Sequence, residues 1–257
     1  MKIVVLIKQV ADTAEERLLD VNTGRLDREA SEAVFDEINE RALEVALQYK
    51  DSNKGTSVVL MSMGPKDALE ALRRGLSMGA DSAVHVLDQR LEGADAAKTA
   101  SVLAAALRTV DFDLVLAGNE STDGRSGVVP AMVAEHLGLP LLGGLMSAEI
   151  TEGDVRGQRQ GEDGVLQLRS SLPAVITVTE RSAEARFPSF KGILGAKRKQ
   201  VNVLSLEDLP PLNEQGASRT VVLSTQTRPA RSAGRKIIDD GTAAEELAEF
   251  LVTNRLA

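Results

Sequence analysis

Short aliphatic runs alternate with segments of helical periodicity along the first half of the chain, and this alternation constrains the fold more than any other feature. Apolar residues recur every three or four positions between the runs, which predicts helices there. The runs themselves lack polar alternation, which fits strands buried on both faces. We therefore expect a doubly wound, mostly parallel α/β sheet with right-handed crossovers. The expected strands are Lys2–Ile7, Ser57–Met63, Ala83–Leu87 and Leu114–Ala117, and the expected helices are Phe35–Lys50, Asp67–Ser77, Ala94–Val110 and Val128–Leu137.

The pattern changes after residue 140. Three short segments with glycine-rich turns predict a small antiparallel meander, and one more buried strand follows. Residues 180–199 have no clear period, and Pro210-Pro211 indicates a boundary. We expect an α/β domain over residues 1–209 and an extended C-terminal arm over residues 210–257. The meander strands are expected at Leu145–Ile150, Asp154–Gln160 and Val165–Arg169, the later strand at Ala174–Thr179, and a helix of the arm near Ala243–Leu251.

Composition excludes several classes of protein. Apolar residues make up 43% of the 257 positions but aromatic residues only 2%, so the core must be aliphatic. The formal charge is 30 − 38 = −8, which argues against nucleic acid as a partner. The chain has no cysteine and only His85 and His136, so we expect no disulfide, thiolate nucleophile or metal site. No apolar run approaches the ~20 residues of a membrane helix, and we expect a cytoplasmic protein without membrane insertion.

The loop after the fourth expected strand has the chemistry of an anion site. Its glycines would let backbone N–H groups approach a phosphate, and the helix that follows adds partial positive charge. No Gly-Lys-Ser/Thr follows, so the loop is not a P-loop. We interpret it as a cradle that holds a nucleotide without cleaving it; the alternative is a solvent-exposed turn. The glycines are Gly118, Gly124 and Gly127, and the hydroxyl residues are Ser121, Thr122 and Ser126.

Two acidic residues near the same sheet edge have two interpretations each. Asp12 either caps a turn or contacts a ligand, and Asp123 either binds a ribose hydroxyl or caps the next helix. Met63 closes the second strand, where the backbone could bracket a base. His85 lies within a strand and is expected in the core. The sequence offers no recognisable pair of nucleophile and base, which suits a protein that holds a nucleotide without its own catalytic residues.

Residues 186–199 combine apolar and cationic side chains on an otherwise acidic chain. This combination is typical of a docking surface for a partner. The alternative is a loop that covers a sheet edge with its phenylalanines buried. The apolar residues are Phe187, Phe190, Ile193 and Leu194, and the cations are Lys191, Lys197, Arg198 and Lys199.

Taken together in order and spacing, eight segments resemble the β subunit of electron transfer flavoprotein. The resemblance covers nearly the whole chain, and Ala11 stands where the family usually has proline. The segments are Val5–Thr13, Leu26–Glu29, Glu40–Leu47, Ser62–Pro65, Leu76–Asp81, Asp113–Asp123, Leu172–Val175 and Arg186–Lys199.

This resemblance implies a heterodimer with an α subunit that holds most of one FAD. Such a complex accepts electrons from flavin dehydrogenases, such as the acyl-CoA dehydrogenases of fatty acid oxidation, and passes them through a quinone oxidoreductase towards the respiratory chain. The β subunit of the common class binds AMP as a structural ligand, and Phe190 matches the family's apolar docking anchor. The positions implied for AMP are Leu6, Asp36, Asn39, Met63, Gly118, Asn119, Glu120, Ser121, Thr122, Asp123, Gly124, Arg125, Ser126, Gly127, Val128 and Val129.

Two departures from the family leave alternatives open. The chain reads Asp36-Glu-Ile-Asn39 where the family often has Asn-Pro before an aromatic residue, and Gly127-Val-Val-Pro130 where many members have Gly-Gln-Val-Gly. The electron-bifurcating class carries a second FAD in place of AMP, with a glutamine-rich loop. Residues 119–126 lack that loop, so AMP is favoured. An adenylate-forming ligase and a nucleotide-sensing module without a redox role are the other candidates.

Overall fold

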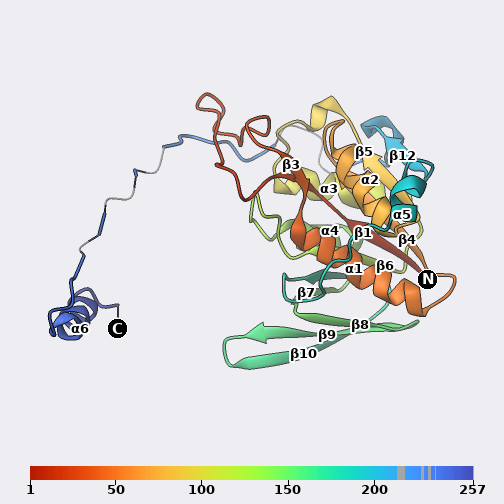
Figure 1. Cartoon of the computed structure of the whole chain (residues 1–257). Coiled ribbons are helices and arrows are strands. Elements are labelled where there is room, and N and C mark those ends of the chain that lie inside the picture. Colours follow the sequence, from red (N-terminus) through yellow and green to blue (C-terminus); the bar gives the residue numbers. More distant parts are fainter. Residues whose placement is uncertain (213–217, 227–228, 231–232, 235, 257) are drawn as a thin grey trace. The chain divides into compact units, whose positions relative to one another are not determined.

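The computed structural model describes residues 1–212, 218–226, 229–230, 233–234 and 236–256. The chain divides into two compact units, Met1–Leu223 and Ser224–Ala257. In the first unit, seven parallel strands form a central sheet in the order β12-β5-β4-β1-β6-β11-β7 (Figure 1). The strands are β1 (Lys2–Leu6), β4 (Ser57–Met63), β5 (Ser82–Val86), β6 (Leu114–Gly118), β7 (Leu141–Leu145), β11 (Ala174–Val178) and β12 (Val201–Leu204).

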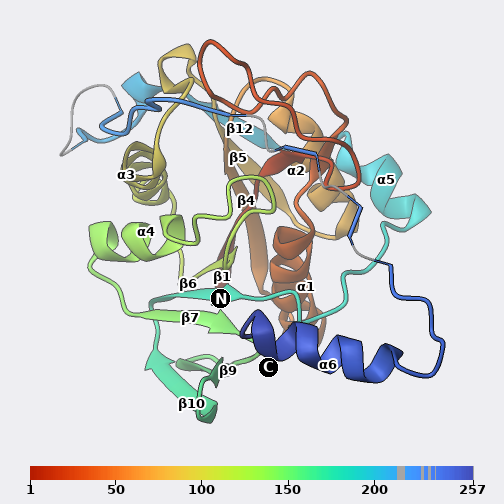
Figure 2. The same ribbon diagram turned by 90° about the vertical axis from the view of Figure 1, so that its left-hand side faces the viewer.

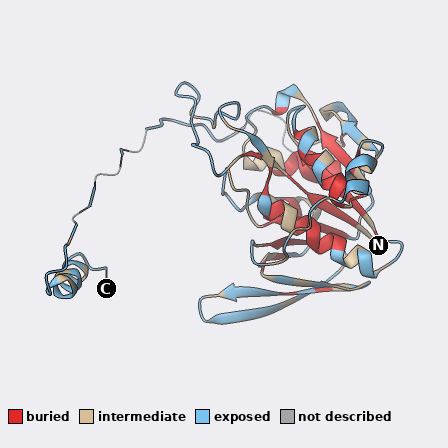
Figure 3. Ribbon diagram, viewed as in Figure 1, coloured by how far each residue is buried: buried red, intermediate tan, exposed pale blue. Residues whose placement is uncertain are grey.

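Helices cover both faces of this sheet (Figure 2). Alternate residues of β1 enter two separate cores: Ile3 and Val5 pack on the face of α1 and α2, and Val4 and Leu6 pack on the face of α3 and α4. Figure 3 shows the buried residues concentrated in these strands and in the helix faces that meet them. The predicted doubly wound α/β sheet is therefore confirmed. The helices are α1 (Glu37–Ser52), α2 (Ala68–Met78), α3 (Ala96–Leu107), α4 (Val129–Leu137) and α5 (Phe190–Ala196).

The predicted antiparallel meander is also present, as a three-stranded sheet in the order β10-β9-β8. Its first strand was predicted too early. Leu141–Leu145 belongs to the central sheet as β7, because it pairs in parallel with β11, and the meander begins only at Ser147. The strands are β8 (Ser147–Ile150), β9 (Asp154–Gly161) and β10 (Gly164–Ser171).

Several short elements were not predicted. A two-stranded sheet pairs β2 (Gln9–Ala11) with β3 (Ala33–Phe35), so Phe35 ends a strand and α1 begins two residues after it. In the aperiodic segment, α5 spans only seven residues, and β12 just after that segment spans only four, which is too short for a period to show.

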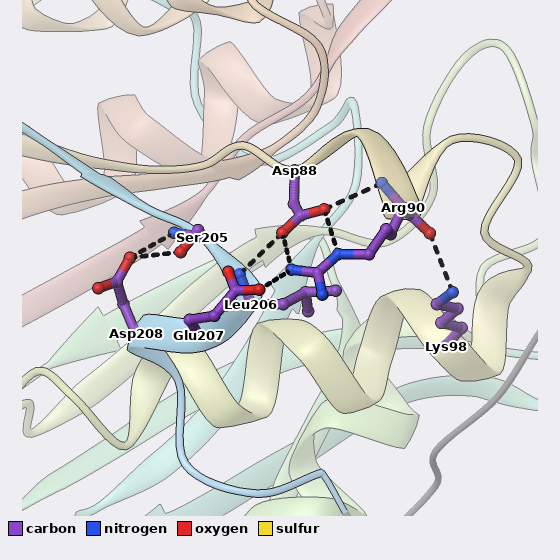
Figure 4. A network of polar contacts seen from close by, with 7 residues as sticks. All are labelled: Asp88, Arg90, Lys98, Ser205, Leu206, Glu207 and Asp208. Atoms are coloured by element: carbon purple, nitrogen blue, oxygen red, sulfur yellow. Dashed lines mark hydrogen bonds and ion pairs between the residues drawn. The ribbon is translucent and has the colours of Figure 1, made fainter.

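A polar network fastens the edge strand β12 to the loop after β5 (Figure 4). Asp88 accepts hydrogen bonds from Arg90 Nη2 at 2.6 Å and from the Leu206 N–H at 3.1 Å. Arg90 also pairs with Glu207 at 2.6 Å. The 3₁₀ turns η1 (Gln89–Leu91) and η2 (Leu206–Asp208) thus meet through charged side chains.

In the second unit, α6 (Ala243–Thr253) is the helix of the C-terminal arm, close to its predicted position. No residue of α6 is buried, and Leu247, Phe250 and Val252 are all exposed. Within the described ranges, no helix is both long and apolar enough to cross a membrane.

Candidate functional site at the carboxyl edge of the sheet

The candidate site lies where the chain order of the sheet reverses. Strand β1 is central, with β4 on one side and β6 on the other, so the connections after β1 and β6 diverge at their carboxyl ends. Ligands of open α/β sheets bind in the crevice at such a reversal. The three strands place Leu6, Met63 and Gly118 at this edge. At Gly118, a Cβ atom would lie 2.6 Å from Asn39 Nδ2, so the start of α1 packs directly on the end of β6.

Asp36 joins the nucleotide loop, residues 118–129, to the start of α1. One carboxylate oxygen accepts hydrogen bonds from the N–H groups of Ile38 and Asn39, both at 3.1 Å, and so caps the helix. The other oxygen accepts from the Thr122 N–H at 2.7 Å and from its hydroxyl at 2.8 Å. Asp36 is fully buried, and its hydrogen bonds join the start of α1 to the nucleotide loop. The sequence assigns these two segments to the site separately.

Asp123 forms a second tie, to the N-terminal segment. Its carboxylate is only 1% exposed and pairs with Lys8 Nζ at 2.8 Å and with Arg28 Nη2 at 2.7 Å. Burial alone would raise the pKa of Asp123. The charge of Lys8 and hydrogen bonds from Lys8, Ser121 and Arg28 outweigh it, and hold the pKa well below its usual range. Asp123 does not cap α4, because that helix begins later, with Val128 at its N-cap.

The start of α4 is open to an anion. Val128 has no polar side chain and makes no capping bond, so the N–H groups of Val129 and Ala131 have no side-chain cap, while Pro130 between them has no N–H. Gly127 turns into the helix with a φ of +64°, and a Cβ atom there would meet only the Asn119 carbonyl oxygen at 3.6 Å. The side-chain oxygen of Asn119 is buried and has no hydrogen-bond partner among the described residues. Uncapped N–H groups at a helix start fit a phosphate.

The loop also contains an ion pair of its own. Arg125 has a φ of +49°, and its guanidinium donates to Glu120 Oε1 at 3.0 Å. The remaining loop residues, Gly124 and Ser126, are exposed, and Val129 is half-buried.

Two polar residues outside the loop have structural roles. The Asp12 carboxylate accepts from the Ala14 N–H at 2.9 Å, so it caps a turn. His85 is buried, with Nε2 3.1 Å from the Gly64 carbonyl oxygen, as expected of a core histidine. Among the described residues, no group of three or more His, Asp or Glu could hold a metal ion.

The segment proposed for docking exposes its apolar side chains. Phe187 is 89% exposed and Phe190 79%, and Ile193 and Leu194 are at least half exposed. The alternative in which the phenylalanines are buried is therefore wrong. Lys191, Lys197 and Arg198 are exposed beside them.

Lys199 differs from the other cations of this segment. Its ammonium donates to the carbonyl oxygens of Leu76 and Ala80 at 2.9 and 2.5 Å, next to the end of α2. Burial lowers the pKa of Lys199, and the charge of Lys50 adds to that effect. Lys199 thus supports the fold and is not free to meet a partner.

The architecture and its open edge define a doubly wound α/β protein with a candidate ligand site at the chain reversal. The family described as "Electron transfer flavoprotein domain" matches residues 23–209. The electron transfer flavoprotein subunits beta of Mycobacterium tuberculosis and Mycobacterium leprae are 47% and 48% identical to this chain, over 99% of it and 98% of each relative. The caffeyl-CoA reductase-Etf complex subunit CarD of Acetobacterium woodii is 35% identical, over 98% of this chain and 97% of the relative.

The chain therefore belongs to the electron transfer flavoprotein family, as a β subunit. Its role is electron transfer within a flavoprotein, and a β subunit implies an α subunit as partner.

Proposed function

We propose that the chain binds AMP at the nucleotide loop and forms a heterodimer with an α subunit that holds most of one FAD. The observation that carries the AMP assignment is the open start of α4, with Gly127 at positive φ before it. Helix N–H groups and the helix dipole would hold the phosphate there. The flavin supplies the redox chemistry when bound. The residues of this chain bind the nucleotide and supply no redox chemistry of their own.

The test is the nucleotide that co-purifies with the complex. Mass spectrometry of the denatured complex is expected to find AMP in stoichiometric amount. Gly127→Leu should abolish it, because a side chain there enters the phosphate approach. Gly138→Leu is the matched control: its φ of +67° imposes the same backbone strain at the other end of α4, where a Cβ atom would meet nothing. Absence of any nucleotide, or equal loss in both variants, would reject the cradle.

A second candidate is the class that carries a second FAD in this subunit. The 35% identity to a subunit of a caffeyl-CoA reductase-Etf complex favours it. The absence of the glutamine-rich loop at residues 119–126 argues against it. Two FAD per heterodimer in the same extract would establish this class and exclude AMP.

The exposed residues of the docking segment support a second part of the proposal. Phe190, with Ile193 and Leu194, is proposed to enter a pocket on an acyl-CoA dehydrogenase or another flavin dehydrogenase, and a quinone oxidoreductase would accept the electrons for the respiratory chain. Lys191 and Lys197 would speed the encounter with an acidic surface. Phe190→Ala should slow reduction by the dehydrogenase about 30-fold, the effect of a hot spot worth roughly 2 kcal/mol. Reduction by dithionite, measured in the same stopped-flow instrument, should not change.

The C-terminal arm supports the heterodimer. Helix α6 buries no residue within its own unit, so its exposed Leu247 and Phe250 suit a surface on the α subunit. Truncation at Pro211 should weaken the heterodimer on gel filtration while leaving the circular dichroism of the α/β unit in place. An unaffected complex would show that the arm does not bind the α subunit.

A further inference from the structure

The helix that carries Phe190 has little apolar packing of its own. Only Ala196 of the seven residues of α5 is buried, while Phe190, Ile193 and Leu194 face solvent. An open pocket of about 350 Å³ lies at the contact of α5 with α2, lined by Arg73, Ser77, Ile193, Ala196 and Lys197. Hydrophobic burial therefore contributes little to the position of α5, and other contacts must fix it.

One set of contacts holds the chain where it enters the docking segment. Glu44, buried in α1, accepts from Arg186 Nε at 2.7 Å, from its Nη2 at 2.9 Å and from its backbone N–H at 3.2 Å. Arg186 also pairs with Asp51 at 2.9 Å. Bidentate pairs of this kind fix direction as well as distance. Phe187 follows directly, so this pair sets where the docking segment begins.

A second set holds the end of α5 on α2. Arg73 Nη1 donates to the carbonyl oxygens of Ala196 and Lys199 at 2.7 and 2.8 Å. Lys199 in turn donates to the carbonyl oxygens of Leu76 and Ala80. The segment is thus held at both ends by cations on carbonyl or carboxylate oxygens.

The middle of α5 rests on α2 through a glycine. A Cβ atom on Gly192 would lie 2.2 Å from the backbone carbonyl oxygen of Ser77, closer than any real Cβ contact, so the two backbones touch here. Any side chain at position 192 must push α5 away from α2. Gly195, on the same helix, has nothing within 4 Å of its Cβ position.

The geometry points to Glu44 and Gly192 as positioning residues of docking: they hold α5 so that Phe190 and Leu194 meet the partner in one fixed orientation. This inference rests on the docking role proposed above for Phe190. It adds that affinity for the dehydrogenase depends on residues that the partner never touches. Pre-organisation of this kind lowers the cost of ordering a segment on binding.

Gly192→Ala and Gly195→Ala, in the complete FAD-loaded heterodimer, form the decisive pair. Both replace a glycine in the same short helix by alanine, so both have the same effect on helix propensity, but only the first displaces α5. We expect Gly192→Ala to raise the KM for the heterodimer in the dehydrogenase assay about tenfold, with kcat and dithionite reduction unchanged. Gly195→Ala should stay within about twofold of the parent protein.

A second pair of variants, in α1, tests the same positioning of α5. Glu44→Gln removes the charge that binds Arg186, and Glu40→Gln is the control, since Glu40 lies on the same helix and pairs with Arg74. We expect faster amide hydrogen exchange over residues 186–199 in Glu44→Gln and Gly192→Ala and not in their controls. Combined with Phe190→Ala, each variant should reduce the rate by a smaller factor than it does alone, because one of the two anchors that it positions is already gone.

The outcomes separate this inference from the proposed function. If Phe190→Ala slows reduction by the dehydrogenase while Gly192→Ala behaves like Gly195→Ala, docking stands and positioning is rejected. If Phe190→Ala has no effect, docking by this helix fails, and the inference fails with it. A faster exchange without a change in KM also rejects it, because α5 would then be displaced without consequence.

Discussion

The nucleotide loop and the docking helix α5 are both connections that follow strands of the same sheet, but they are fixed in opposite ways. In the loop, Thr122 bonds to the buried carboxylate of Asp36 at the start of α1, and the buried carboxylate of Asp123 pairs with Lys8 and Arg28 of the N-terminal segment. Helix α5 is held only at its ends and at Gly192, and its large side chains face solvent. The difference teaches that the proposed nucleotide site is tied to the core by buried charges, whereas the proposed docking surface is attached to the core at a few points.

The contrast between the loop and α5 is wrong if the hydrogen bonds of Asp36 can be removed without loss of stability. Asp36→Ala removes the cap of α1 and leaves Thr122 without its acceptor, so we expect a loss of about 3 kcal/mol of folding free energy. For a chain of this size that lowers the melting temperature by about 6–12 °C. Asp67→Ala is the control, because Asp67 occupies the N-cap of α2 but its side chain makes no capping bond. Calorimetry of the complex should show less than about 2 °C for that variant, and equal shifts would disprove the tie.

The pH dependence of stability gives a second test, at Asp123. Its folded-state pKa is depressed, so the carboxylate stabilises the fold above the unfolded value of about 4, and the contribution is lost as the pH falls below that value. Asp123→Asn should cost about 1–2 kcal/mol at pH 7, less than Asp36→Ala because Lys8 and Arg28 remain half-exposed. The cost should shrink between pH 5 and pH 3. If the melting temperatures of the parent protein and Asp123→Asn differ by the same amount at every pH in this range, the stabilising role of the Asp123 carboxylate is contradicted.

The smallest expected effect on stability is at the docking helix. Phe190→Ala should change the folding free energy by less than about 0.5 kcal/mol, since the ring is almost entirely exposed. Phe35→Ala, which removes a buried ring of the same size, should cost about 3–5 kcal/mol. Similar losses in the two melting experiments would mean that Phe190 packs in solution and that the contrast between the two regions is wrong.

The sequence predicts the parts of this molecule that depend on local pattern. The strands of β1, β4, β5 and β6 end within one residue of their expected limits, because buried aliphatic runs bounded by turn residues have a strong local signal. Helix α5 and strand β12 were missed because their positions depend on distant residues, namely Arg73 on α2 and the edge of β5.

In the candidate site too, some features follow from local sequence pattern and others depend on distant residues. The glycine and hydroxyl pattern of residues 118–129 indicates a cradle without any knowledge of the fold. That Asp36 and Thr122 meet, 122 − 36 = 86 residues apart, does not follow from local pattern. Nor does the burial of Asp123 between Lys8 and Arg28, because both cations come from the far N-terminal segment.

The strand order also determines when each strand can find its neighbours during synthesis of the chain. Strand β5 can join β4 soon after it leaves the ribosome, but its other neighbour, β12, is synthesised much later, since His85 pairs with Val203, 203 − 85 = 118 residues on. At about 5–20 residues per second, β5 remains the open edge of the nascent sheet for roughly 6–24 s. An unpaired edge of Ala83, Val84 and Val86 invites pairing with other chains. The contacts of Arg90 with Glu207 and of Asp88 with the Leu206 N–H end this interval, because they can form only when the segment after β12 has docked.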